Sequence, residues 1–217
     1  MPSKDRIVEA LLERHGRTYA GELGIDLAKG TPSVLFRWLC ASILLSARIS
    51  AEVAMSAARA LTDQGWTTAQ KMAASTWEQR TRTLNQAGYA RYDESTSRML
   101  GETAGMLIEK YSGDLRRLRG AASRDPVAER RLLKECKGLG DVGVDIFFRE
   151  AQVAWDELYP FAGRRDLDAA ARLGLNNDAA GLAKHVSRDD FPRLTAALVR
   201  ASLAKDLDDI REQAKSR

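Results

Sequence analysis

The residues best suited to chemistry lie in one short stretch, 135–145, which reads Glu-Cys-Lys-Gly-Leu-Gly-Asp-Val-Gly-Val-Asp. Gly138 and Gly140 interrupt a helical pattern with residues that tolerate positive φ. The pattern predicts that one helix ends near Cys136 and that another begins at about Asp141. Peptide N–H groups in the first turn of a helix lack intrahelical acceptors and attract anions. The turn is therefore a candidate site for one phosphate group, built from main chain.

The side chains of this stretch fit a tight turn between two helices. Leu139 is expected to point back between the helices and to lock the turn. An ordinary interhelical turn also contains glycine, so the glycines alone leave both interpretations open.

Three further stretches extend the pattern: Leu44-Leu45-Ser46-Ala47-Arg48-Ile49-Ser50, Gly88-Tyr89 and Arg172-Leu173-Gly174-Leu175. Together with the glycine turn, they resemble in the same order the motifs of the endonuclease III-like DNA glycosylases, the helix-hairpin-helix–Gly/Pro/Asp superfamily. The hairpin of that family reads roughly Leu-Pro-Gly-Val-Gly-x-Lys-Thr-Ala. In this chain Lys137 stands at the proline position and Val142 at the lysine position. The matches span most of the chain.

The resemblance implies an all-α fold with two helical lobes and a helix-hairpin-helix at the cleft between the lobes. Residues 1–217 are then one compact unit, expected to be a monomer. The central lobe is predicted at about 30–125. The second lobe is predicted from 1–29 and 126–217 and contains the hairpin at 135–145.

The function implied by the resemblance is base excision repair of DNA. Such an enzyme flips a damaged base out of the duplex and breaks its glycosidic bond, while a carboxylate stabilises the positive charge that develops on the sugar. Relatives that also cut the strand use a lysine as nucleophile. Val142 has no nucleophile, so the sequence predicts a monofunctional DNA N-glycosylase that removes the base by hydrolysis. The alternative is a catalytically silent binder of damaged or distorted DNA.

The catalytic carboxylate is the point where the chain departs from the family. The family spacing leads to Gly163 when counted back from Arg172, and to Pro160 when counted forward from the hairpin. Neither residue has a carboxylate. Asp166 is the first candidate and Asp168 the second, whereas Asp145 and Asp156 are weaker. The alternative for Asp166 is a helix cap.

Other DNA contacts are implied by the matching positions. The hairpin residues expected to hold a phosphate are Lys137, Gly138, Leu139, Gly140, Val142 and Gly143. Arg48 is expected to probe the gap opposite the flipped base, or to hold a phosphate. Tyr89 is expected to fill that gap, or to pack in the core, and Arg91 and Tyr92 are expected to contact DNA nearby.

Three aromatic residues follow the hairpin and are expected to line the base pocket: Trp155, Tyr159 and Phe161. Core packing is the alternative for each of them.

Composition supports a helical DNA-binding protein. The 217 residues are 44% hydrophobic but only 6% aromatic, and the net charge is +4. Residues 110–138 contain nine basic and four acidic residues, so this block carries +5 and the rest of the chain −1. A basic block that leads into a phosphate-binding turn is typical of partners of double-stranded DNA. The alternative for this block is a solvated helix face. A helical scaffold for protein partners is a third function class for the whole chain, and it accounts for the amphipathic helices but not for the basic hairpin.

Cofactors and location are constrained by the cysteines and by hydropathy. The two cysteines, Cys40 and Cys136, indicate buried thiols in a reducing compartment. No cysteine follows Cys136, which excludes the four-cysteine iron–sulfur cluster of many relatives. No other cofactor and no metal site is predicted, although the resemblance allows a monovalent cation at the hairpin carbonyls. The polar start and the lack of long apolar runs predict a cytoplasmic protein, at the nucleoid if bacterial, with no membrane span.

Overall fold

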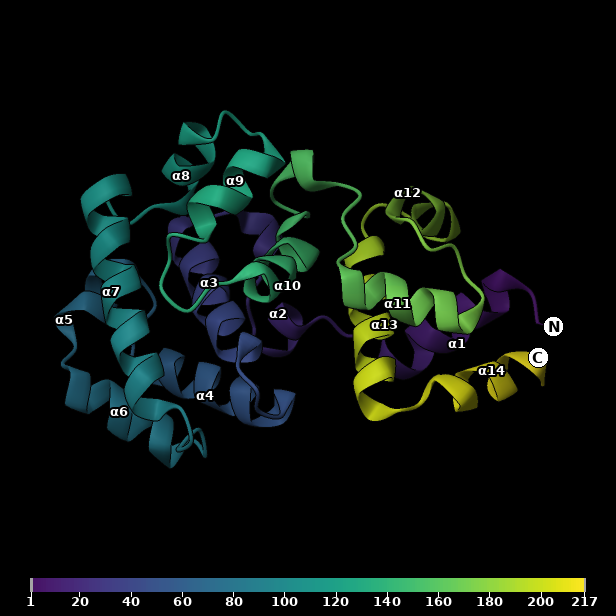
Figure 1. The fold of residues 1–217 in the computed structure, drawn as a ribbon, viewed down its shortest axis with the longest axis horizontal. Coiled ribbons are helices and arrows are strands. Elements are labelled where there is room, and N and C mark those ends of the chain that lie inside the picture. The colour runs from purple at the N-terminus through teal and green to yellow at the C-terminus, as the bar shows by residue number, and fades with distance from the viewer. Residues whose placement is uncertain (1, 217) are drawn as a thin grey trace. The chain divides into compact units, whose positions relative to one another are not determined.

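The structure is a computed structural model that describes residues 2–216. Every regular element in this range is a helix (Figure 1), so the predicted all-α class is confirmed. No helix in this range is long and apolar enough to cross a membrane.

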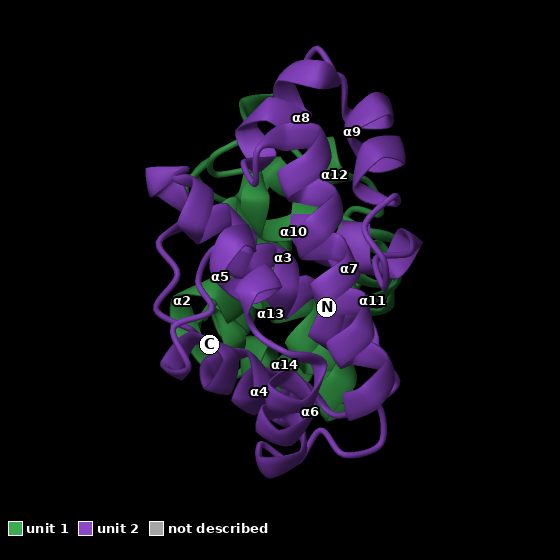
Figure 2. Ribbon diagram, turned by 90° about the vertical axis from the view of Figure 1, so that its left-hand side faces the viewer, with its two compact units in different colours: residues 1–22, 148–217 green, residues 23–147 purple. Residues whose placement is uncertain are grey.

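The chain forms two compact units (Figure 2). Unit 1 contains residues 1–22 and 148–217, and unit 2 contains residues 23–147. The boundary falls inside helix α10, Asp141–Ala151. The hairpin therefore belongs to the same unit as the predicted central lobe, whereas the sequence grouped it with the two ends of the chain. The physical reason is that the hairpin packs on helices α3 and α7 of unit 2, as described below.

Unit 2 is built around helix α3, Pro32–Ser46, whose residues from Leu35 to Leu44 are mostly buried. Helix α3 packs against α4, α7 and α8. The elements of unit 2 that precede α10 are a 3-10 helix (Leu27–Lys29), α3, α4 (Ala51–Asp63), α5 (Ala69–Ala74), α6 (Trp77–Gln86), α7 (Asp93–Tyr111), α8 (Leu115–Ala121) and α9 (Pro126–Leu133).

Unit 1 has its own core, in which α1 and α11 pack against α13 and α14. Its elements outside α10 are α1 (Lys4–His15), α2 (Tyr19–Glu22), 3-10 helices at Asp156–Leu158 and Ala183–His185, α11 (Arg164–Leu173), α12 (Ala179–Leu182), α13 (Phe191–Ala204) and α14 (Leu207–Lys215).

Several helix starts are fixed by local side-chain caps. The side chains of Ser3, Ser50 and Thr76 accept hydrogen bonds from the backbone N–H three residues later. Lys205, with a left-handed φ of 58°, separates α13 from α14. The short helices α2 and α8 carry too few residues for a clear sequence pattern.

Candidate nucleic-acid interface

The glycine turn connects two helices. Helix α9 ends at Leu133 and α10 begins at Asp141. Gly138 has a φ of +83°, which L side chains rarely adopt, and the N–H of Leu139 donates to the carbonyl of Cys136 at 3.1 Å. The Leu139 side chain is buried, as expected for a residue that locks the turn.

The turn packs against helices α3 and α7. A Cβ added to Gly138 would lie 2.8 Å from the Sδ of Met99 and 3.1 Å from the Cγ2 of Ile43, so a larger residue would force these side chains to shift. The hydroxyl of Thr103 donates to the carbonyl of Lys137 at 3.1 Å. The Ser46 hydroxyl lies 2.7 Å from the carbonyl oxygen of Ile43 and 3.3 Å from that of Gly138. Its single proton is therefore shared between these two acceptors.

The first turn of α10 presents main-chain donors. Its first intrahelical bond runs from the N–H of Val144 to the carbonyl of Gly140 at 2.9 Å. Within residues 2–216, the peptide nitrogens of Gly140, Asp141 and Val142 have no hydrogen-bond acceptor, and all three residues are exposed. Gly140 has no side chain that could cap the helix. The partial positive charge of the helix start is therefore available to an external anion.

The basic block is partly neutralised by ion pairs. Lys134 donates to Asp141 at 2.8 Å, which lowers the pKa of that carboxyl, and Arg130 pairs with Asp145 at 2.7 Å. Arg116 pairs with Asp114, and Lys110 pairs with Glu135.

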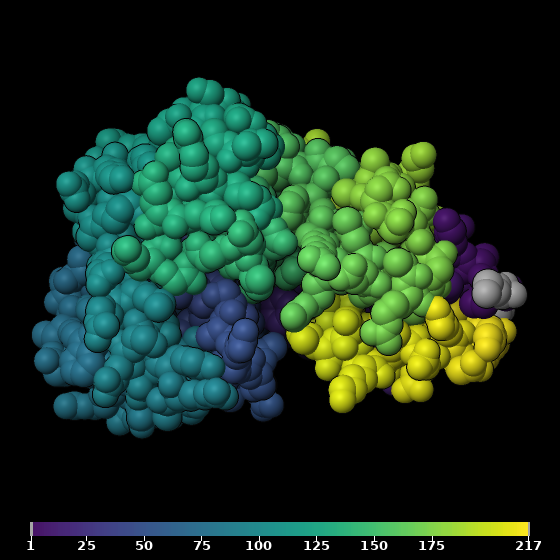
Figure 3. All heavy atoms as spheres, viewed as in Figure 1, coloured from purple at the N-terminus to yellow at the C-terminus, as the bar shows by residue number. Residues whose placement is uncertain are grey.

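Three exposed cations of the block remain without a side-chain partner in the described part of the chain: Arg124, Arg131 and Lys137. Residues from α8 to the start of α10 reach the surface of unit 2 (Figure 3). These cations are the part of the charge signal that is available to a polyanion. Composition indicated the block, but only the pairing pattern separates these three residues from the rest.

The C-terminal end of α3 connects the turn to two other predicted contact segments. Ser46 contacts the hairpin, and Arg48 follows two residues later as an exposed side chain with no partner among residues 2–216. The same end of α3 contacts the loop at Gly88, because the hydroxyl of Tyr89 donates to the carbonyl of Leu44 at 3.1 Å. The structure thus brings the hairpin, Arg48 and the loop at Gly88 onto one end of α3.

Tyr89 itself occupies a different environment from the one that its predicted role requires. Its side chain is fully buried, and burial raises its pKa. A ring that fills a gap in DNA must be exposed. The neighbouring Tyr92 is half-buried, with its ring centroid 6.4 Å from that of Tyr89, and the exposed Arg91 lies 5.2 Å above the Tyr92 ring. Arg91 and Tyr92 are the accessible side chains of this loop.

Asp166 is also buried, in unit 1. It occupies the third position of α11, and its Oδ2 accepts a hydrogen bond from the N–H of Gly163 at 2.7 Å. The buried Arg149 donates to the same carboxylate, with its Nε 3.0 Å from Oδ1. Asp166 therefore stabilises the start of α11 and pairs with an arginine. This is the helix-capping alternative of the sequence analysis, except that Asp166 lies inside the first turn and not at the N-cap position.

Asp168 has the opposite environment. Its side chain is 71% exposed, and its nearest cation is the Nε of Arg164 at 3.9 Å. Of the two predicted catalytic carboxylates, only Asp168 is accessible to water or to a substrate.

The three predicted pocket aromatics lie in packing contacts of unit 1. Trp155 is 1% exposed. The Tyr159 ring packs edge-on against Phe191 at 5.6 Å, and the Phe161 ring packs edge-on against Phe148 at 5.4 Å. In this structure they stabilise the core of unit 1, and Tyr159 and Phe161 keep part of their surface exposed.

The described residues include no group of three or more His, Cys, Asp or Glu side chains that could hold a metal ion. Both thiols are buried, which raises the pKa of Cys136 to about 12 and that of Cys40 still further. A monovalent cation at the hairpin would have to share the carbonyl oxygens of Lys137 and Gly138 with the hydroxyls of Thr103 and Ser46.

Comparisons with known proteins give one similarity of fold. No family model matches the sequence, and no curated protein matches it. A solved structure described as a trapped endonuclease III–DNA covalent intermediate, in an estranged-adenine complex, is similar with a TM-score of 0.48 and 17% identity. The similarity covers 75% of this chain and 71% of that chain. Because it is weak, the functional proposal rests on the residues of this chain.

Proposed function

We propose that this protein binds double-stranded DNA through the hairpin and acts as an endonuclease III-like DNA glycosylase of base excision repair. It removes a damaged base by hydrolysis, without lysine-dependent strand cleavage. The observation that carries the proposal is the first turn of α10, where three exposed peptide nitrogens without acceptors adjoin the exposed Lys137. A backbone phosphate satisfies these donors, and its charge is stabilised by the helix start.

Neighbouring groups support a nucleic-acid partner over a small anion. Arg124 and Arg131 add unpaired charge on the same stretch of chain, and Arg48 and Arg91 add exposed guanidinium groups on segments that contact the end of α3. Several exposed cations on neighbouring segments of the same unit fit a polymer of phosphates. Such binding weakens steeply as salt rises, because each contacted phosphate releases counterions.

The chemistry is proposed to use Asp168 as the carboxylate that stabilises the developing charge and orients water. It is the only one of the two predicted acids with an exposed side chain. The silent DNA binder remains the second candidate, because the carboxylate of Asp166 is fully occupied by Gly163 and Arg149.

DNA binding is tested by measuring the affinity of a duplex at several salt concentrations with fluorescence anisotropy. In Lys137→Gln, the slope of log K against log salt should be shallower by about 0.9. Lys184→Gln removes one exposed charge from unit 1 and should leave the slope unchanged. Equal slopes for both variants would remove the hairpin from the interface, and the absence of salt-dependent binding would favour the protein scaffold.

Catalysis is tested by incubating the protein with duplexes that each carry one damaged base and by measuring base release and abasic sites. A glycosylase should release at least one base, leave the strand uncut, and lose release in Asp168→Asn while still binding DNA. Release that survives in Asp168→Asn would exclude this residue. DNA binding without release from any lesion would identify the silent binder.

A further inference from the structure

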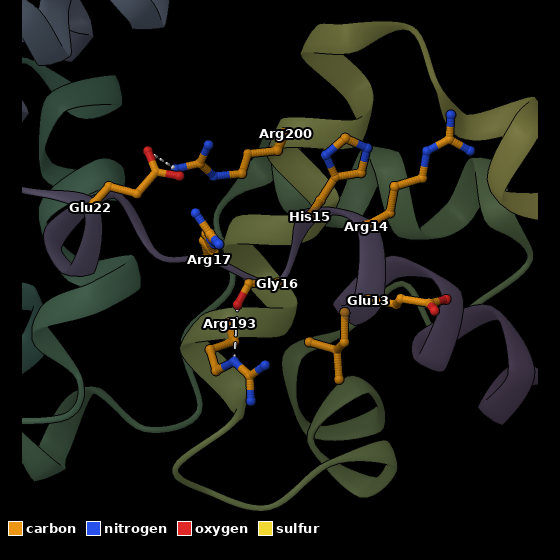
Figure 4. A pocket seen from close by; sticks show the side chains of 9 residues that line it. Glu13, Arg14, His15, Gly16, Arg17, Glu22, Arg193 and Arg200 are labelled. Atoms are coloured by element: carbon orange, nitrogen blue, oxygen red, sulfur yellow. Dashed lines mark hydrogen bonds and ion pairs between the residues drawn. The ribbon is translucent and has the colours of Figure 1, made fainter.

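Unit 1 contains a pocket of about 270 Å³ at the C-terminal end of α1, facing α13 (Figure 4). All residues that line it belong to unit 1, and the hairpin contributes none. Its volume is below the ~300–1,000 Å³ of pockets that hold drug-sized ligands. The pocket is therefore suited to a small ligand.

The lining carries an excess of positive charge. Four arginines (Arg14, Arg17, Arg193 and Arg200) face two glutamates, and His15 lies beside them. Arg14 and Arg193 are already occupied: Arg14 pairs with Asp206 at 3.0 Å, and Arg193 donates to Asp190 at 2.6 Å and to the carbonyl of Gly16 at 3.0 Å. Arg200 pairs with Glu22 but makes no side-chain hydrogen bond, and the Arg17 side chain has no partner in the described chain.

Arg200 has donors that the protein does not satisfy. Its Nε and Nη2 atoms are buried and make no hydrogen bond within the described chain. Nη2 lies 3.0 Å from the Oε2 of Glu22, which is an ion pair without hydrogen-bond alignment, and the guanidinium stacks 3.9 Å above the ring of Tyr19. Protein atoms cover those two nitrogens, whereas Nη1 is neither buried nor hydrogen-bonded within the described chain. Nη1 is therefore the donor of this guanidinium that a ligand in the pocket can reach.

Arg17 supplies the second open guanidinium. Its side chain is exposed and has no ion pair or hydrogen bond in the described chain. Figure 4 shows it between Arg193 and Arg200, whereas Arg14 and Glu13 point away from this group. Two guanidinium groups that approach from different sides match an anion with several oxygen acceptors.

We propose that this pocket binds a phosphate group, with Arg17 and Arg200 as its ligands. The inference does not depend on the proposed base-excision activity. The phosphate comes either from a small phosphorylated molecule or free phosphate, or from the backbone of a nucleic acid. The chemistry of recognition is the same in both cases.

The test is calorimetric titration of the full chain with inorganic phosphate near neutral pH, at an ionic strength held constant with chloride. Wild type should bind phosphate saturably at one site, and Arg17→Gln should bind it about tenfold more weakly, the loss expected for one charge-assisted contact. Arg17 makes no contact that folding requires, so this variant should fold. Arg172→Gln removes an exposed charge at the end of α11 and should bind like wild type. No saturable binding, or equal binding by wild type and Arg17→Gln, overturns the proposal.

A second measurement identifies the source of the phosphate. If inorganic phosphate competes with duplex DNA and Arg17→Gln weakens both, the pocket takes a backbone phosphate. If Arg17→Gln loses phosphate but keeps its DNA affinity, the ligand is a small molecule. Either result supports the site. Lys137→Gln should keep its phosphate affinity, so failure of the hairpin proposal is distinguishable from failure of this one.

Discussion

The Nε of Arg149 lies 3.0 Å from Oδ1 of Asp166 and 3.3 Å from Oδ2, and the two side chains are 5% and 0% exposed. This buried pair joins the end of α10 to the start of α11, where Asp166 also accepts the N–H of Gly163. One carboxylate thus neutralises a buried cation and accepts a backbone hydrogen bond at the start of a helix. That double role explains why an acid stands here without being accessible to a substrate.

Asp166→Asn should therefore be strongly destabilising. It leaves Arg149 as a buried charge without its counter-ion, a change that costs ~3–5 kcal/mol in the free energy of unfolding. Asp168→Asn changes an exposed side chain and should alter stability by less than ~0.5 kcal/mol. Urea unfolding followed by circular dichroism measures both. Similar midpoints for the two variants would mean that the Arg149 pair does not stabilise the fold.

Glycine substitutions should separate the strained turn from an ordinary helix. Gly138→Ala places a Cβ on left-handed backbone, against Met99 and Ile43, and should cost at least ~1–2 kcal/mol. Gly105→Ala lies inside α7, where nothing approaches the added Cβ, and should stabilise by up to ~1 kcal/mol. Thermal unfolding should thus shift in opposite directions. A neutral Gly138→Ala would show that the turn relaxes without cost.

A lysine at position 142 should convert the proposed chemistry. Val142 stands where the motif that the sequence resembles has a lysine, and its side chain is 61% exposed, so Val142→Lys should fold normally. Its amine can attack the sugar carbon and form a Schiff base, which borohydride reduces to a covalent protein–DNA adduct. Val127→Lys, at a site 77% exposed, is the matched control and should give no adduct. Gel mobility after reduction measures both, and equal trapping would place position 142 outside the reacting centre.

Stability should depend on pH through Glu150. This carboxyl is buried, accepts the N–H groups of Tyr19 and Ala20 at 2.8 and 2.7 Å, and has a pKa of about 7 because burial outweighs those bonds. A folded-state pKa above the unfolded value of 4.5 means that the folded state holds the proton more tightly. Stability from this group is therefore fully present below pH 4.5 and is lost as pH rises to about 7, by up to ~3 kcal/mol.

The measurement is the free energy of unfolding between pH 4.5 and 7 for wild type and for Glu150→Gln, which cannot titrate. The variant should lack this part of the pH dependence, although it loses one of the two backbone hydrogen bonds. Glu102→Gln, on the exposed face of α7, should keep the wild-type slope. Identical slopes in wild type and Glu150→Gln would show that this carboxyl does not titrate in that window.

The sequence by itself determined the features that depend on neighbouring residues. Hydroxyl caps such as Ser3 and Ser50 bond to N–H groups three residues away, so the helix starts could be predicted. The glycine pattern likewise determined the left-handed turn at Gly138 and the open helix start at Asp141. The charges of the basic block could also be counted from the sequence. The sequence did not show which of these charges are paired.

Only the tertiary structure decided which groups are accessible. Tyr89 is buried because its hydroxyl reaches Leu44, which is 45 residues away, and Asp166 is occupied because Arg149 approaches from another helix. The arginines that line the pocket come from α1, from the segment that follows it and from α13, so no local pattern predicted that site. A sequence records the chemistry of each side chain and of its near neighbours, whereas burial and pairing depend on which distant segments pack against it.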